Sequence, residues 1–72
     1  MTYALQIRRL RESRGMTQRQ LADRLGLSPA AVAHWELGRK KPTTDNLLAM
    51  AELFGCSTDA ILGREPPDSE AG

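Results

Sequence analysis

Residues 17–37 read TQRQLADRLGLSPAAVAHWEL, in which two short helical segments follow each other closely. The first segment opens with a complete start signal, because Thr17 can cap the helix and the side chain of Gln20 can return a hydrogen bond to it. The second opens with Ser28 and Pro29, a capping residue followed by a residue that suits the first helical turn. This stretch therefore predicts two capped helices in direct succession.

The connection between these helices, residues 26–28, is so short that they must cross steeply, as in a helix-turn-helix arrangement. At the crossing, Ala22 is small enough to let the helices approach, and Gly26 permits the positive φ that the turn requires. Leu21 and Val32 can pack beneath the pair. We expect the whole of the quoted stretch to form one helix-turn-helix unit.

The remainder of the chain is also helical in pattern. Apolar residues recur at four-three spacing over residues 3–14, and further capped apolar segments lie at residues 42–55 and 56–63. No run alternates with a period of two residues, so no strand is expected. The sequence predicts an all-α, compact domain of five helices over residues 1–63, followed by a disordered acidic tail over residues 64–72.

Charge is distributed unevenly along the chain of 72 residues. Residues 1–42 carry nine Lys/Arg against three Asp/Glu, a balance of +6, and residues 43–72 carry one against six, a balance of −5. The two halves together give the formal net charge of +1. A basic end suits a polyanion, and a solvated charged surface explains the asymmetry equally well.

Composition argues against several classes of protein. The single cysteine, Cys56, cannot form an internal disulfide, and neither paired cysteines nor clustered histidines suggest a metal site. With one histidine and no paired-carboxylate pattern, we expect no enzyme, no catalytic residue and no cofactor. No apolar run reaches membrane-spanning length and no signal-peptide pattern is present, so we expect a cytoplasmic protein without membrane contact. The short chain also predicts no small-molecule effector.

Two charged residues fall on helix faces that should be buried. On a helical wheel, Glu36 lies beside Trp35 on the inner side of the third helix. Arg11 lies beside Ile7 on the inner side of the first helix. A buried charge without a partner is costly. We therefore predict that Arg11 and Glu36 form a largely buried, structural ion pair that ties the first helix to the third.

A series of motifs runs through the first two thirds of the chain. They are Gly15-x-Thr17-Gln18-x-x-Leu21-Ala22, the Gly26 turn, Trp35-Glu36-x-Gly38, and Pro42 before the fourth helix. With these motifs the chain resembles, over residues 3–63, the phage-repressor/Cro (xenobiotic-response-element) family of helix-turn-helix DNA-binding domains. The resemblance implies a lambda-repressor-like domain that binds double-stranded operator DNA, usually as a dimer, with the helix of residues 28–37 in the major groove.

Two groups of candidate DNA-binding residues follow. The resemblance implies base or groove contacts on the third helix, from Ser28, Pro29, Ala30, Ala33 and His34. Phosphate contacts are expected where free amides begin the second helix and where basic residues follow the third, from Gln18, Arg19, Arg39, Lys40 and Lys41. The resemblance also implies a phosphate-contacting glutamine at the Gln18 position. Arg9 and Arg14 are further candidates, and each polar residue is alternatively a solvated surface residue.

The outward face of the third helix is poor in hydrogen-bonding groups. Pro29 and the alanines offer only methyl or methylene contacts, for example to thymine methyl groups. None of the five groove candidates can make the bidentate pairing that arginine makes with guanine. We expect His34 to face outward. We predict that short side chains let this helix sit deep in the groove, while phosphate contacts and DNA shape supply much of the discrimination.

Two alternatives to a repressor stay open. The same fold can serve as a protein-interaction module that does not bind DNA, which the methyl-rich face and an outward Leu5 favour. A DNA-binding antitoxin or operon control protein would carry the same domain as a repressor. For a DNA-binding protein we expect a homodimer, because two modest surfaces on a two-fold operator combine their affinities.

Overall fold

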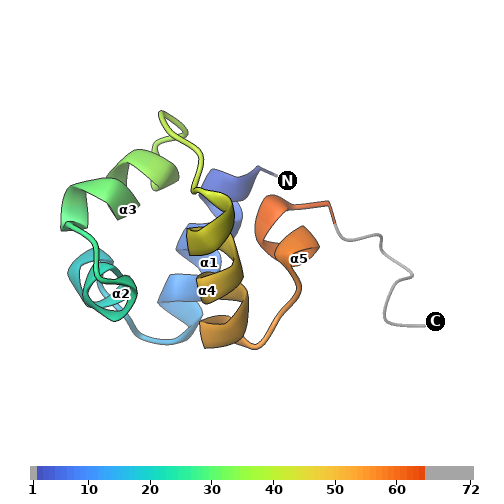
Figure 1. Cartoon of the computed structure of the whole chain (residues 1–72), viewed down its shortest axis with the longest axis horizontal. Helices are drawn as coiled ribbons and strands as arrows, with labels where there is room; N and C mark the ends of the chain where they lie inside the picture. The colour runs from blue at the N-terminus through green and yellow to red at the C-terminus, as the bar shows by residue number, and fades with distance from the viewer. Residues whose placement is uncertain (1, 65–72) are drawn as a thin grey trace.

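The computed structural model describes residues 2–64, which form five α-helices and no strand (Figure 1). The helices are α1 (Tyr3–Ser13), α2 (Gln18–Leu25), α3 (Pro29–Glu36), α4 (Thr44–Phe54) and α5 (Thr58–Leu62). The all-α, five-helix prediction is confirmed. Helices α1 and α3 each end one residue earlier than expected, because Arg14 and Leu37 occupy the cap positions. Apart from Arg64, the predicted tail lies outside the described residues.

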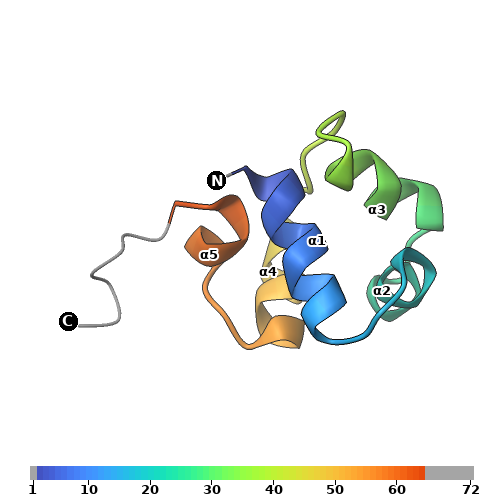
Figure 2. The ribbon, with the colours of Figure 1, turned by 180° about the vertical axis from the view of Figure 1, so that it is seen from behind.

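The five helices share one apolar core. Figures 1 and 2 show α1 and α4 in the middle of the molecule, with the α2–α3 pair on one side and α5 on the other. Every helix contributes at least one buried apolar side chain. The buried set is Ile7, Leu21, Ala22, Val32, Trp35, Met50, Phe54 and Ile61. The core therefore holds α3 from one side and leaves its opposite side facing outward.

The helix starts follow the capping signals of the sequence. At α2, the Thr17 hydroxyl accepts a hydrogen bond from the Gln20 amide at 3.0 Å, and the Gln20 side-chain oxygen accepts one from the Thr17 amide at 2.8 Å. This is the predicted capping box. Thr2, Thr43 and Ser57 cap their helices with single hydrogen bonds. Local sequence thus determines where four of the five helices begin.

The start of α3 differs from the prediction. Ser28 has the backbone conformation of a cap, but its hydroxyl makes no capping hydrogen bond, so the expected side-chain cap is wrong. The amide that this hydroxyl would serve belongs to Ala31, and it donates instead to the Ser28 carbonyl at 3.0 Å. Pro29 has no amide hydrogen to satisfy. The Ser28 hydroxyl is consequently left available at the exposed end of α3.

The turn between α2 and α3 depends on one left-handed residue. Gly26 has φ 71° and ψ 32°, and the next amide, that of Leu27, donates back to the Ala22 carbonyl at 2.9 Å. Ala22 is fully buried, as the close approach of the two helices requires. A side chain at Gly26 would meet no atom within 4 Å, so the backbone conformation alone favours glycine here.

We expect Gly26→Ala to lower the free energy of unfolding by about 1–2 kcal/mol, because a Cβ is disfavoured in the left-handed conformation. Gly26→Asn is the matched control, since asparagine tolerates this conformation better. Urea denaturation of the parent chain and both variants measures the two losses. Equal losses from alanine and asparagine would contradict the conformational explanation.

Candidate nucleic-acid interface

The predicted ion pair between Arg11 and Glu36 is present and joins α1 to the last residue of α3. Arg11 donates from Nε to Oε2 of Glu36 at 2.7 Å and from Nη2 to Oε1 at 2.9 Å. The two side chains are only 11% and 5% exposed. The hydrogen bond with Glu36 raises the pKa of Arg11 above its ordinary value despite the opposing effect of burial. The guanidinium also donates to the Met16 carbonyl at 2.8 Å, which fixes the loop before α2.

The side chain of Gln18 is tied into the same group. Its amide nitrogen donates to Oε1 of Glu36 at 3.1 Å, so the first residue of α2 is linked to the last residue of α3. The sequence suggested only a phosphate contact for Gln18 and gave no sign of this internal bond. The bond holds Gln18 beside the N-terminal amides of α2, which favour an anion. Its amide oxygen makes no hydrogen bond within residues 2–64, and its phosphate contact stays a prediction.

The outer face of α3 is as poor in polar groups as the sequence predicts. Ser28, Pro29 and Ala30 are exposed, and Ala33 is partly covered. The same face continues into Leu37, which is 64% exposed and was not among the predicted contact residues. A helical wheel would have found it, because Leu37 falls on the side of Ala30 and Ala33. The face that α3 turns outward is therefore largely a surface of methyl and methylene groups.

His34 is the one predicted groove residue that the structure places differently. It was expected to face outward, but its side chain is partly covered and its Nδ1 atom is fully buried without a hydrogen-bond partner. The chain after α3 folds back here, because the amides of Arg39 and Lys40 donate to the His34 carbonyl at 2.9 and 3.4 Å. The expectation of a freely outward histidine is therefore only half right. One edge of the ring is covered by its own protein.

A hollow of about 310 Å³ lies beside α3 and collects several of the predicted site residues. From the predicted set, its lining includes Ser28, Ala30, His34, Lys40 and Lys41. Pro29, Ala33, Gln18, Arg19 and Arg39 lie outside this lining. The start of α4 adds Thr43 and Asn46, which the sequence analysis missed because only the fold brings them next to α3. The arrangement places an alcohol, an imidazole and two ammonium groups along one side of the exposed helix.

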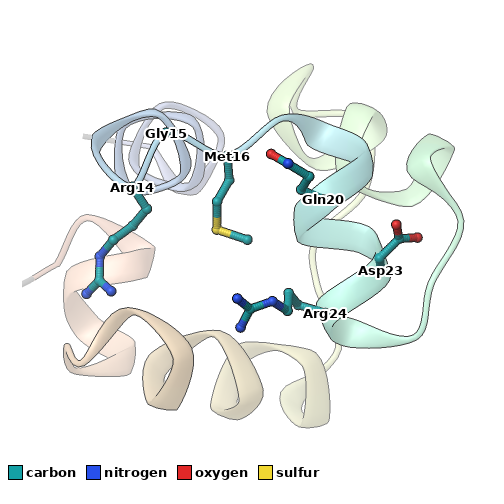
Figure 3. Close-up of a pocket in the computed structure, with 6 residues that line it drawn as sticks. All are labelled: Arg14, Gly15, Met16, Gln20, Asp23 and Arg24. Atoms are coloured by element: carbon teal, nitrogen blue, oxygen red, sulfur yellow. The ribbon is translucent and has the colours of Figure 1, made fainter.

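Arg14 has a structural position and does not lie beside α3. Its guanidinium donates to the Phe54 carbonyl, at the last residue of α4, and its carbon Cζ lies 6.0 Å from the centre of the Phe54 ring. A cation at this end of a helix is favoured by the helix dipole. Figure 3 shows Arg14 and Arg24 on either side of Met16. These residues line a second hollow, of about 410 Å³, formed by the segment between α1 and α2 and by α2 itself. The contacts of Arg14 explain its presence without DNA.

The crossing of α2 and α3 and the groups around α3 match a known family. A family profile described as helix-turn-helix matches residues 7–61. The chain belongs to the helix-turn-helix family. Its α2, the left-handed turn at Gly26 and its α3 are the elements for which this family is named.

Relatives of this helix-turn-helix chain include regulators. The uncharacterized HTH-type transcriptional regulator YobD of Bacillus subtilis is 36% identical over 67 residues, which are 92% of this chain and 60% of that protein. The P22 c2 repressor, solved in complex with a synthetic operator, superimposes with a TM-score of 0.83 at 29% identity, over 90% of this chain and 98% of that one. The chain spans about half the length of the curated relatives that it matches.

The helix-turn-helix fold also occurs within an enzyme. Hydroxypropylphosphonic acid epoxidase from S. wedmorenis superimposes with a TM-score of 0.76 at 33% identity, over 90% of this chain but only 33% of the epoxidase chain. Among residues 2–64 of the present protein, no three His, Cys, Asp or Glu side chains are grouped as metal ligands would be. Over the same part of the chain, no helix has the length and apolar character needed to cross a membrane.

Removing one partner of the Arg11–Glu36 pair should destabilise the helix-turn-helix domain strongly. We expect Arg11→Met to lower the free energy of unfolding by about 3–5 kcal/mol, because Glu36 would stay buried without its charge partner. The double variant Arg11→Met with Glu36→Leu should recover much of this loss, since it removes both charges. Urea denaturation gives both values. A double variant as unstable as the single one would argue that an unpaired charge is not the cause.

Proposed function

We propose that this domain is the DNA-binding unit of a sequence-specific transcriptional regulator, a repressor that places α3 in the major groove of double-stranded operator DNA. The observation that carries the proposal is the exposed outer face of α3, which the basic residues 39–41 follow in the chain and to whose last residue Gln18, at the N-terminus of α2, is hydrogen-bonded. The similarity to a repressor solved on its operator supports the same docking.

In this proposal the two groups of candidate residues have different roles. Phosphate contacts come from Gln18 and Arg19 at the start of α2 and from Arg39, Lys40 and Lys41 after α3. Groove contacts come from Ser28, Pro29, Ala30, Ala33 and His34, and we add Leu37 to this group because it is exposed on the same face. Charged contacts then provide most of the affinity, and the small face of α3 allows close approach to the bases.

We further propose that the domain spans residues 1–63 and acts as a homodimer on a two-fold operator in the cytoplasm. Membership of the helix-turn-helix family and the small size of the α3 face support the dimer, because one such face offers few base contacts. We propose that the domain itself has no catalytic activity, cofactor or small-molecule effector. In this proposal the domain regulates transcription by occupying its operator.

A protein-interaction module is the second candidate, and exposed leucines favour it. Leu37 is 64%, Leu48 is 53% and Leu5 is 39% exposed. Exposed apolar side chains of this size are typical of contact surfaces when they cluster. Leu37 lies on the α3 face that the first proposal assigns to DNA, so the two functions compete for the same surface and can be distinguished by experiment.

Selection of bound genomic fragments distinguishes these functions. The full chain is mixed with fragmented DNA from its source at about 50 and 200 mM salt, and bound fragments are sequenced. An enriched inverted repeat with half-sites about one helical turn apart would establish a dimeric operator-binding regulator. The genes beside the repeat would separate a repressor from an antitoxin or operon control protein. Absence of a shared sequence would favour the interaction module.

Replacing Arg39 should affect all DNA alike. We expect Arg39→Ala to weaken binding to the enriched repeat and to unrelated DNA by similar factors, and to reduce the slope of log affinity against log salt by about one. Arg24→Ala is the matched control, because it removes the same charge from the hollow of Figure 3, away from α3. Fluorescence anisotropy over a salt series measures both effects. A loss confined to the repeat would contradict a phosphate contact.

A further inference from the structure

His34 has one covered and one accessible ring nitrogen. Within residues 2–64, its Nδ1 is the buried side-chain polar atom that lacks a hydrogen-bond partner. Its Nε2 is not among the covered atoms and makes no hydrogen bond to the described part of the protein. A neutral imidazole carries one hydrogen and one lone pair, so the environment of Nδ1 decides what Nε2 presents to a ligand.

The surroundings of Nδ1 disfavour a hydrogen at that atom. A covered N–H without an acceptor is costlier than a covered acceptor without a donor. No acceptor lies within hydrogen-bond distance of Nδ1 among residues 2–64, so a hydrogen at this atom would stay unpaired. The hollow that the His34 side chain also lines contains no aspartate or glutamate that could form an ion pair with the ring. A lone pair at Nδ1 leaves the single hydrogen of the neutral ring on Nε2.

We infer that His34 is held in the tautomer with its hydrogen on Nε2, and that it reads a hydrogen-bond acceptor on the DNA. In the major groove the acceptors are purine N7, guanine O6 and thymine O4, whereas the amino groups of adenine and cytosine are donors. His34 in this form cannot accept from those amino groups. It thus selects for an acceptor at one position of the operator. The selection of an acceptor rests on the proposed function, and the tautomer does not.

The rest of the α3 face makes this donor important for specificity. Pro29, Ala30, Ala33 and Leu37 have no polar atoms in their side chains. The Ser28 hydroxyl can either donate or accept, so it does not discriminate between the two kinds of group. A nitrogen with a fixed hydrogen does discriminate, because an unpaired donor facing a base donor is penalised.

The tautomer can be measured in the free protein. His34 is the only histidine in the sequence, so a long-range ¹H–¹⁵N correlation spectrum of the uniformly labelled full chain at about pH 8, where ordinary histidines are neutral, needs no assignment. We expect Nε2 to show the shift of a protonated nitrogen and Nδ1 that of a nitrogen with a lone pair. A spectrum dominated by the opposite tautomer would overturn the inference.

Asn46→Asp tests the cause of the tautomer preference. It places a negative charge on the lining of the hollow without adding an acceptor, because the side-chain oxygen of Asn46 is already one. We expect the spectrum to stay unchanged, since the covered and unpartnered Nδ1 sets the preference. Asp45→Asn is the control, because it changes a carboxylate on the exposed side of α4, outside the lining of the hollow. A rise of hydrogen on Nδ1 in Asn46→Asp, and not in Asp45→Asn, would assign the preference to charge in the hollow and overturn its assignment to the unpaired Nδ1.

Binding to modified copies of the enriched repeat identifies the DNA atom that accepts the hydrogen bond from His34. Each purine is replaced in turn by its 7-deaza form, each guanine also by 6-thioguanine, each thymine by 4-thiothymine and each phosphate by a methylphosphonate. We expect one base substitution to lower the DNA affinity of the parent chain by at least about fivefold. The same substitution should leave the DNA affinity of the His34→Ala variant unchanged. If a methylphosphonate lowers the affinity of the parent chain and no base analogue does, the acceptor is a phosphate oxygen, and base reading is overturned. Equal sensitivity of His34→Ala would overturn the contact itself.

A chain that binds no DNA would contradict the proposed function and, with it, the reading of an acceptor. The tautomer would then be judged by the spectrum alone. Thermal unfolding of His34→Ala, followed by circular dichroism, shows whether this variant keeps the fold of the parent chain.

Discussion

The Arg11 guanidinium links α1, the loop before α2 and the end of α3 through one buried charge. This one cation bonds the Glu36 carboxylate, where α3 ends, and the Met16 carbonyl, in the loop before α2. Gln18 adds a bond from α2 to the same carboxylate. Next to Trp35, which buries the C-terminal end of α3 in the apolar core, the Arg11–Glu36 pair adds a directed polar contact at the same end of the helix. The charges are costly to bury, but three N–H groups of Arg11 and both oxygens of Glu36 are hydrogen-bonded.

Sequence was sufficient for the features that depend on local chemistry. Caps and left-handed glycines act within a few residues, so the helix bounds could be predicted closely. The Arg11–Glu36 pair was predictable for a different reason: a charge on an inward face requires a partner, and only one opposite charge was suitably placed. Fold-dependent features were not accessible in this way. His34 has a covered ring edge, and the hollow beside it brings together Asn46 of α4 and Lys40, which are distant from one another in the sequence.

The candidate interface separates affinity from discrimination. Positive charge is placed on the segments that flank α3, and α3 itself presents mainly small apolar groups with one imidazole edge. A flexible arginine or glutamine on such a face could adapt to several base pairs by changing rotamer, whereas short side chains on a helix cannot. In the proposed function such a site gains selectivity from rigidity and shape. Its polar groups are few, and the fold covers one edge of the His34 ring.

The exposure of Ser28, Pro29, Ala30 and Leu37 has an evolutionary consequence. None of these side chains belongs to the buried core, and none caps or braces a neighbouring helix. Substitutions at these positions thus leave the buried core intact, and under the proposed function a duplicated gene can drift toward a new operator through folded intermediates. The residues that hold the fold and the residues that face outward alternate along the same short helix, and natural selection can act on the two sets separately.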